Sequence, residues 1–133
     1  MTKSLIDTDI LSYFLKGDEH VAKNFEKYLK GHAKITICEI TYFEILSGLV
    51  FRKAVKQISQ FELFISTCEV IKLSTISLSN SANIYAQLRE IGITIGTADL
   101  LIAGIAKANE LTLVTNNQKH YQPILELETA NWA

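Results

Sequence analysis

The sequence contains few of the residues that mark secreted, membrane-bound or disordered chains. Only two of its 133 residues are cysteines, Cys38 and Cys68, and neither has the spacing of a metal ligand, so we interpret both as free buried thiols. The single proline and a hydrophobic content of 48% argue against disorder. No apolar run reaches the ~18 residues of a membrane-spanning helix, and the N-terminal segment lacks the pattern of a signal peptide. We therefore expect a cytoplasmic chain without a membrane partner.

Excess charge and histidine clusters are also absent. The net charge of −1 argues against a nucleic-acid-binding surface spread over the whole molecule, but it is compatible with a basic rim around an acidic pocket. The histidines, His20, His32 and His120, are far apart in the sequence and predict no site for a softer metal such as zinc. A chain of this length buries enough surface for one domain, so we predict that residues 1–133 fold as a single unit.

The sequence does contain a regular alternation of short β-rich segments and helical patterns. Strands are expected over residues 5–6, 35–38, 69–73, 111–115 and 124–127, and helices over residues 10–17, 18–31, 39–51, 53–66 and 77–91, with a further helix that begins near Thr97. In the helix over residues 77–91, the side chains expected to face inward are Leu78, Ala82, Tyr85 and Leu88. This alternation predicts an α/β fold with a central, mainly parallel sheet of four to five strands flanked by helices.

The segment from Ile95 to Asn117 is the most unusual part of the chain. It has no polar side chain over residues 100–106, which is typical of a helix that is buried on all sides. Asp99 lies in the first turn of this helix, where Thr97 is the expected N-cap. A carboxylate in such an apolar setting needs a partner, and a metal ion is a candidate because nearby cations are few. An ordinary position at the helix start, in contact with water, remains the alternative.

Three more polar residues are expected at the same edge of the sheet as Asp99. Ligands of open parallel sheets bind beyond the carboxyl ends of the strands. Asp7 follows the first strand, Glu44 lies in the helix after the second, and Asn117 follows the fourth. Asp9 is well placed to cap the first helix, which would leave Asp7 free. The simpler alternatives are that Asp7 is itself a cap and that Glu44 points to water.

Three carboxylates at one sheet edge would form a site for a hard divalent cation. Mg²⁺ prefers oxygen ligands, and it often takes one or two carboxylates and keeps several waters. Such an ion suits phosphate chemistry, because it polarises a phosphoryl oxygen and lowers the pKa of a bound water. The expected ligands suit Mn²⁺ as well, so Mn²⁺ is an alternative to Mg²⁺.

Five short motifs, taken in their order and spacing, resemble those of one family. They are LIDTDIL near the start, ITYFEILSG in the middle, IGTADLLIAGIAKA and LVTNN in the second half, and Asn131-Trp132 at the end. Over essentially its full length the chain resembles the PIN-domain ribonucleases, specifically the VapC-type toxins of toxin–antitoxin pairs. The resemblance implies helices packed around a parallel sheet. It also implies a Mg²⁺-dependent endoribonuclease whose RNA products carry a 5′-phosphate and a 3′-hydroxyl.

The resemblance also implies a set of site residues. The three core acids of the family fall onto Asp7, Glu44 and Asp99, and its small hydroxyl residue falls onto Thr8. A fourth acid, present in many members, falls onto Asn117, whose uncharged amide binds a cation more weakly, so we expect one metal ion. Our hypothesis is that Asp7 and Asp99 hold this ion. Glu44 would then orient or deprotonate the attacking water.

Three kinds of partner follow from the resemblance: RNA, a second copy of the chain, and a VapB-type antitoxin whose tail lies along the active-site groove. The helices over residues 39–66 carry a large apolar face that could receive a protein partner or belong to the core. Its members are Phe43, Leu46, Val50, Phe51, Phe61 and Phe64. The basic residues near the expected site could contact RNA phosphates or form an ordinary solvated surface; they are Arg52, Lys53, Lys56, Lys119 and His120.

Two other functions remain compatible with these residues. Asp7 and Asp9 after a strand resemble the nucleophile motif of haloacid-dehalogenase-type phosphatases, although Leu11 stands where those enzymes have threonine and their later acidic pair is missing. The second is a catalytically weak PIN-like domain that only binds RNA or protein, which the amide at Asn117 keeps open.

Overall fold

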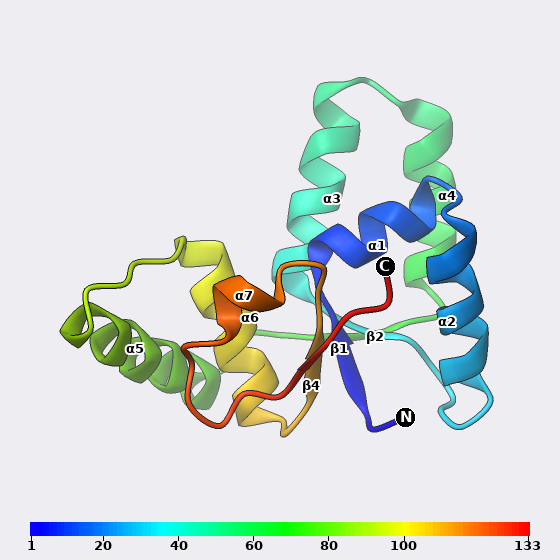
Figure 1. Cartoon of the computed structure of the whole chain (residues 1–133). Helices are drawn as coiled ribbons and strands as arrows, with labels where there is room; N and C mark the ends of the chain where they lie inside the picture. Colours follow the sequence, from blue (N-terminus) through cyan, green and yellow to red (C-terminus); the bar gives the residue numbers. More distant parts are fainter.

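The computed structural model describes residues 1–133 and contains five short strands, all paired in parallel (Figure 1). One ladder has the order β1-β4-β5 and the other joins β2 to β3. Leu5 in β1 lies opposite Leu113 in β4, and β1 also lies beside β2, so the two ladders are neighbours. The strands are β1 (Ser4–Ile6), β2 (Thr36–Cys38), β3 (Glu69–Ile71), β4 (Thr112–Val114) and β5 (Thr129–Ala130). The predicted α/β fold with a parallel sheet is confirmed, with the sheet divided into three and two strands.

Seven helices connect and cover the strands. They are α1 (Thr8–Leu15), α2 (Glu19–Leu29), α3 (Glu39–Phe51), α4 (Val55–Ile65), α5 (Thr75–Glu90), α6 (Thr97–Ala108) and α7 (Gln118–Tyr121). α5 begins at Thr75 because Ser74 and Ser77 form a reciprocal capping box, in which each backbone N–H donates to the other side chain. The N-cap of α6 is Gly96 and not the expected Thr97. None of the helices is both long and apolar enough to cross a membrane.

Side chains alternate along the strands between two hydrophobic cores. Leu5 and Leu113 contribute to the core shared with α5, α6 and α7, whereas Ile6 and Val114 contribute to the core shared with α1 to α4. Figure 1 shows these two groups of helices on opposite sides of the strands, with α3 and α4 rising as an antiparallel pair above α1. The sheet is therefore the middle layer between two helical layers, and its carboxyl edge lies where the two layers meet.

The core beneath α1 to α4 is rich in aromatic rings. Trp132, the only tryptophan of the chain, is buried there and packs edge-on against Phe25 and at a tilt against Tyr28. The side-chain amide of Asn24 donates to the carbonyl oxygen of Trp132 at 3.1 Å. These contacts fix the end of the chain beside α2.

α5 and α6 pack so closely that only glycine fits at position 104. A Cβ atom there would lie 1.9 Å from Ser81 Oγ and 2.6 Å from the backbone oxygen of Ser77. The Ser81 hydroxyl hydrogen-bonds to the carbonyl oxygen of Leu100 at 2.8 Å. The small side chains of α5 therefore face α6, and the expected inward face was wrong at three of its four positions. The buried residues of α5 are Ser77, Ser81, Ile84 and Leu88, and Leu78, Ala82 and Tyr85 are exposed.

The last strand is not where the sequence predicts it. The apolar residues over 124–127 form no strand, because Glu126 adopts a left-handed φ of 61° that interrupts an extended chain. Ile124 is buried while Leu125 is exposed, so this stretch is a turn that anchors one side chain in the core. The strand follows as β5, in which Thr129 pairs with Leu113 of β4.

Candidate active site

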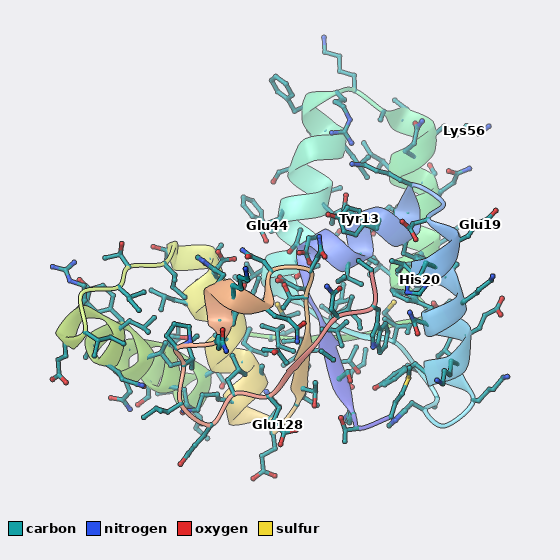
Figure 2. The ribbon with its side chains drawn as sticks, in the orientation of Figure 1. Tyr13, Glu19, His20, Glu44, Lys56 and Glu128 are labelled. Carbon is teal, nitrogen blue, oxygen red and sulfur yellow. The ribbon has the colours of Figure 1, made fainter.

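The five residues predicted to form the site line one pocket at the carboxyl ends of the strands. The pocket has a volume of about 640 Å³, and its walls come from α1, α3, α4, the start of α6 and the turn after β4. Figure 2 shows Glu44 projecting from the lower half of α3, near the start of α1. Parallel strands place their carboxyl ends at one edge of the sheet, so these distant segments meet there as expected. The roles of the five residues stay predictions. The five residues are Asp7, Thr8, Glu44, Asp99 and Asn117.

Asp7 is the most deeply buried acid of the pocket, with only 6% of its surface exposed. It occupies the N-cap position of α1 with an extended backbone, and its Oδ1 accepts a hydrogen bond from the Thr8 backbone N–H at 2.8 Å. The expectation that Asp9 caps this helix is therefore wrong, because Asp9 already lies within its first turn. One oxygen of Asp7 fixes the turn after β1, and the other, Oδ2, lies 3.4 Å from the hydroxyl of Tyr121, which also lines the pocket.

The surroundings of Asp7 disfavour its ionised form. Burial raises the pKa of the carboxyl from 3.8 to about 6, and the negative charges of Asp9 and Asp99 add to this effect. No lysine or arginine lies within 4 Å of these acids, and the one basic side chain in contact with them is His120, whose Nε2 lies 3.0 Å from Asp99 Oδ2. A buried carboxyl in such a place either keeps a proton or receives a cation.

The role of Asp9 was missed because one of its two backbone contacts lies far along the chain. Its Oδ1 accepts from the Ile10 backbone N–H at 2.7 Å, and its Oδ2 accepts from the Asn116 backbone N–H at 3.0 Å. The Asn117 backbone N–H donates to Thr115 Oγ1 at 3.1 Å, which leaves the Asn117 side-chain amide for the pocket. Asp9 therefore ties the turn after β4 to α1, in addition to lining the pocket itself.

Both oxygens of Asp99 accept hydrogen bonds from α7. Tyr121 donates its hydroxyl proton to Oδ1 at 3.0 Å, and His120 donates from Nε2 to Oδ2 at 3.0 Å. The Tyr121 hydroxyl also lies 3.4 Å from Oδ2 of Asp7, so this single hydroxyl group contacts both carboxylates. Burial and the charges of Asp7 and Asp99 raise the pKa of Tyr121, which keeps it a donor. Tyr121 was not anticipated, because nothing in its local sequence indicates a partner 114 residues away.

Glu44 lies on the exposed side of α3 and is held by a chain of hydroxyl groups. The Thr8 hydroxyl donates to Glu44 Oε1 at 2.7 Å. Because Thr8 has a single hydroxyl proton, it must accept from Thr41 Oγ1 at 2.9 Å, and Thr41 in turn accepts from the buried thiol of Cys38 at 3.8 Å. This chain fixes Oε1 and leaves Oε2 without a partner in the protein. Glu44 is thus both exposed and part of the pocket.

The chemistry of this end of the pocket fits a hard divalent cation. The ligands it presents are carboxylate and amide oxygens, and no thiol lines it. No group of three or more His, Cys, Asp or Glu side chains is arranged to hold a metal ion by itself. Mg²⁺ does not require such a group, because one or two carboxylates with several waters are enough. The predicted ligands, Asp7 and Asp99, both contact the Tyr121 hydroxyl and so lie side by side in the pocket.

The other end of the pocket is lined by cationic and amide side chains. Among the basic residues that the sequence suggested, only Arg52 lines the pocket. Lys16, which directly follows α1, also lines it and was not anticipated, and Gln57 and Gln60 of α4 complete this end. The pocket therefore changes from acidic to cationic along α1 and α3.

The apolar face predicted over α3 and α4 is divided between core and surface. Phe61 is fully buried, and Leu46 and Phe64 pack against the core. The exposed part includes Phe51, with 87% of its surface accessible. The exposed apolar residues of α3 and α4, which we call the hairpin patch, are Phe43, Val50, Phe51, Val55 and Leu63.

Known proteins of one family are similar to the chain over its full length. The PIN domain family matches residues 4–123. Ribonuclease VapC2 of Rickettsia felis is 33% identical over 96% of both chains, and the tRNA(fMet)-specific endonuclease VapC of Shigella flexneri is 25% identical over 100% of both. The solved structure of VapBC2 from Rickettsia felis bound to a DNA fragment from its promoter contains a chain with a TM-score of 0.90 and 31% identity, covering 98% of each chain. DNA-bound VapBC from Salmonella typhimurium gives a TM-score of 0.90 at 28% identity over 100% of each chain.

These similarities decide between the alternatives that the sequence left open. The phosphatase alternative is excluded, since the match is to another family and Leu11, at the position of the phosphatase threonine, is buried in the core. The parallel sheet and the matched length agree with the family resemblance of the motifs. The chain therefore belongs to the PIN-domain family and, within it, to the VapC-type ribonuclease toxins of toxin–antitoxin systems.

Proposed function

We propose that this chain is an endoribonuclease that hydrolyses RNA phosphodiester bonds with the help of one divalent metal ion, Mg²⁺ or alternatively Mn²⁺. The observation that carries the proposal is the buried carboxyl of Asp7, which faces Asp9 and Asp99 without a lysine or arginine within 4 Å. In this proposal Asp7 and Asp99 hold the ion. When bound, the ion would polarise a phosphoryl oxygen and lower the pKa of a water molecule.

The remaining site residues would prepare the attacking water. Glu44 is proposed to accept the proton of this water at Oε2, because the Thr8 hydroxyl already fixes Oε1 and so sets the orientation of the carboxylate. The Asn117 side-chain amide would orient a water or a phosphate oxygen at the far side of the pocket. Tyr121 and His120 would keep Asp99 in place through their hydrogen bonds to its two oxygens.

A cleavage assay with matched aspartate variants tests this proposal. We expect RNA cleavage with Mg²⁺, no cleavage with EDTA, and a loss of at least about a hundredfold for Asp7→Asn or Asp99→Asn. Asp18→Asn is the matched control, because Asp18 caps α2 outside the pocket and asparagine caps a helix equally well. Equal rates for the two pocket variants and the parent would refute the assignment. Complete lack of cleavage by the parent would favour the binding-only PIN-like alternative.

We further propose transfer RNA as the first substrate to assay. The Shigella flexneri relative is named as an endonuclease specific for tRNA(fMet), and it matches the chain from end to end. Comparing initiator tRNA with other structured RNAs of similar length would show whether this preference extends to the present chain. Equal cleavage of all the RNAs would restrict the proposal to RNA in general.

An antitoxin and a second copy of the chain are the proposed protein partners. The similar chains from Rickettsia felis and Salmonella typhimurium were solved as VapBC, and the hairpin patch leaves an apolar surface uncovered here. We expect Phe51→Ser to weaken binding of the cognate antitoxin in a pull-down while leaving the fold intact. Size-exclusion chromatography with light scattering on the isolated chain should give twice the mass of one chain. A monomer would remove the dimer from the proposal.

A further inference from the structure

The pocket is longer than a metal ion and one phosphate require, and two helices run along it. α1 and α3 both start near the acids, and each is followed by a cation: Lys16 after α1 and Arg52 after α3. Lys16 lies eight positions after Thr8, and Arg52 lies eight positions after Glu44. At a rise of 1.5 Å per residue, each cation begins about 12 Å from the acids. The backbones of Lys16 and Arg52 therefore lie at about the same distance from the site, on two walls of the pocket.

The side chain of Arg52 folds back toward the acids. A Cβ atom on Gly48 would lie 3.3 Å from Arg52 Nη1, so the guanidinium lies against the backbone of α3 one turn before its own residue. Gly48 lies between Glu44 and Arg52 along α3 and also lines the pocket. The absence of a side chain at Gly48 thus allows the positive charge to lie along the wall of the pocket.

Neither Lys16 nor Arg52 pairs with a carboxylate of the protein. The carboxylate contacts of basic side chains in this chain join Lys3 to Glu69 and His120 to Asp99, so Lys16 and Arg52 have no carboxylate within 4 Å. Both are exposed. A cation that lines a pocket without an internal partner is available for an anionic ligand.

Two amide side chains line the same pocket as the cations. Gln57 and Gln60 are three residues apart, so they share one face of α4, and both line the pocket. Each amide offers a donor and an acceptor, which is the combination that the edge of a nucleobase requires. No hydrogen bond inside the protein uses either amide.

We propose that this end of the pocket is a nucleotide subsite for the RNA strand beside the scissile phosphate. Lys16 and Arg52 bind phosphate oxygens, and Gln57 and Gln60 contact the edge of the adjacent base. The inference rests on the proposed function, because a strand whose phosphate lies at the acids has to continue along the pocket. A nucleic acid carries one negative charge per nucleotide and exposes polar base edges, so it matches both pairs of side chains better than an acidic peptide does.

The test uses the full chain and a fluorescently labelled single-stranded RNA of mixed sequence, about 12 nucleotides long. In steady-state cleavage with Mg²⁺, the double variant Lys16→Gln/Arg52→Gln should raise KM by roughly tenfold and change kcat by less than about twofold. The dependence of KM on salt should weaken by a log–log slope of about 1.4, since two phosphate contacts are lost. Arg52→Lys, combined with the native Lys16, should retain most of this salt dependence.

The chain offers a control with the same loss of charge. Lys53 and Lys56 are close to Arg52 in the sequence but do not line the pocket, and Figure 2 shows Lys56 extending outward from α4. Lys53→Gln/Lys56→Gln should leave both KM and its salt dependence close to those of the parent. An equal effect of the two double variants would show that net charge, and not a subsite, is responsible, and would overturn the proposal.

The positions at which the RNA is cleaved test the proposed contact between the two glutamines and a base. Gln57→Leu/Gln60→Leu should change the distribution of cleavage positions, whereas the Lys16 and Arg52 variants should weaken cleavage uniformly across sequences. An unchanged distribution would overturn the base contact.

Two further outcomes separate this inference from its alternatives. If the Lys16 and Arg52 variants keep the KM for RNA but lose binding of a labelled poly-glutamate peptide, the subsite belongs to an acidic protein segment and the proposal is wrong. If the parent protein cuts no RNA, fluorescence anisotropy of the same labelled RNA with the same variants measures the subsite directly. Weaker binding by the pocket variants alone would then support the subsite although the proposed hydrolysis had failed.

Discussion

The two helical layers that cover the sheet differ in how tightly they are packed. In the layer of α5 and α6, the helices approach so closely that Gly104 touches Ser81 and no Cβ atom fits between them. In the layer of α1 to α4, the helices enclose a pocket of about 640 Å³ and leave large side chains such as Phe51 exposed. The first layer supplies Asp99 from a closely packed helix, and the second supplies Glu44 and most walls of the pocket. A tight layer that positions a carboxylate is thus combined with an open layer that admits ligands.

The largest expected effect on stability comes from adding one methyl group to each layer. Gly104→Ala should lower the free energy of unfolding by about 2–4 kcal/mol, because the new Cβ would overlap Ser81 Oγ and the backbone of Ser77. Gly48→Ala in α3 should raise it by about 0.5–1 kcal/mol, since the only close atom is the flexible end of Arg52 and alanine favours a helix. Urea denaturation of the two variants measures this difference. Similar changes in the free energy of unfolding for the two variants would show that the two layers accommodate an added methyl group equally well.

The second prediction concerns Asp7, where the two layers meet. Its raised pKa of about 6 means that the folded chain binds a proton more tightly than the unfolded chain. Ionising Asp7 in the folded chain therefore lowers the free energy of unfolding. This loss is absent below about pH 4, grows as the pH rises to about 6, and reaches its full value above that, at roughly 1.4 kcal/mol for each unit by which the pKa is raised. Asp7→Asn should therefore stabilise the metal-free protein at pH 7.5 by about 1–3 kcal/mol, although it removes activity.

Thermal unfolding in EDTA at pH 5 and pH 7.5 measures this effect. The parent should lose stability between the two pH values relative to Asp7→Asn, whose amide still accepts the Thr8 N–H as a cap. If the parent instead gained stability relative to Asp7→Asn between pH 5 and pH 7.5, burial would not disfavour the ionised form of the Asp7 carboxyl.

The smallest expected effect compares two buried tyrosines, one at the pocket and one remote from it. Tyr121→Phe removes the hydroxyl between Asp7 and Asp99 and should weaken Mg²⁺ binding by roughly tenfold, because the two carboxylates lose the group that sets their spacing. Tyr28→Phe removes a buried hydroxyl that accepts from the Ser4 backbone N–H. Both variants should lose about 1 kcal/mol of stability, and only the first should change the metal affinity. Calorimetric titration with Mg²⁺ separates them, and equal affinities would remove Tyr121 from the site.

The fold could be predicted where short-range patterns and burial agree. α3 begins and ends at the predicted residues, Glu39 and Phe51, because a mainly apolar run of helical length directly follows a buried strand. The gathering of Asp7, Glu44 and Asp99 in one pocket also followed from the sequence, since parallel strands place their carboxyl ends at one edge. These predictions needed only the local pattern and one rule of topology.

What could not be predicted depends on contacts between distant segments. The inward face of α5 was misplaced because Ser77 and Ser81 are buried only by the close approach of Gly104. Asp7 and Asp9 are equally good caps by local criteria, and only the Asn116 N–H, across the sheet edge, separates their roles. Lys16 and Tyr121 join the pocket through tertiary packing that their neighbours in the sequence do not indicate.

The single tryptophan gives the molecule an internal optical probe of one layer. Trp132 is buried against Phe25 and Tyr28 beneath α2, whereas the layer of α5 and α6 contains no indole. Its emission should therefore follow the opening of the α1 to α4 layer, and circular dichroism should follow the loss of helices in both layers. A variant in which the dichroism changed before the fluorescence would reveal that α5 and α6 can loosen while the rest of the chain stays folded.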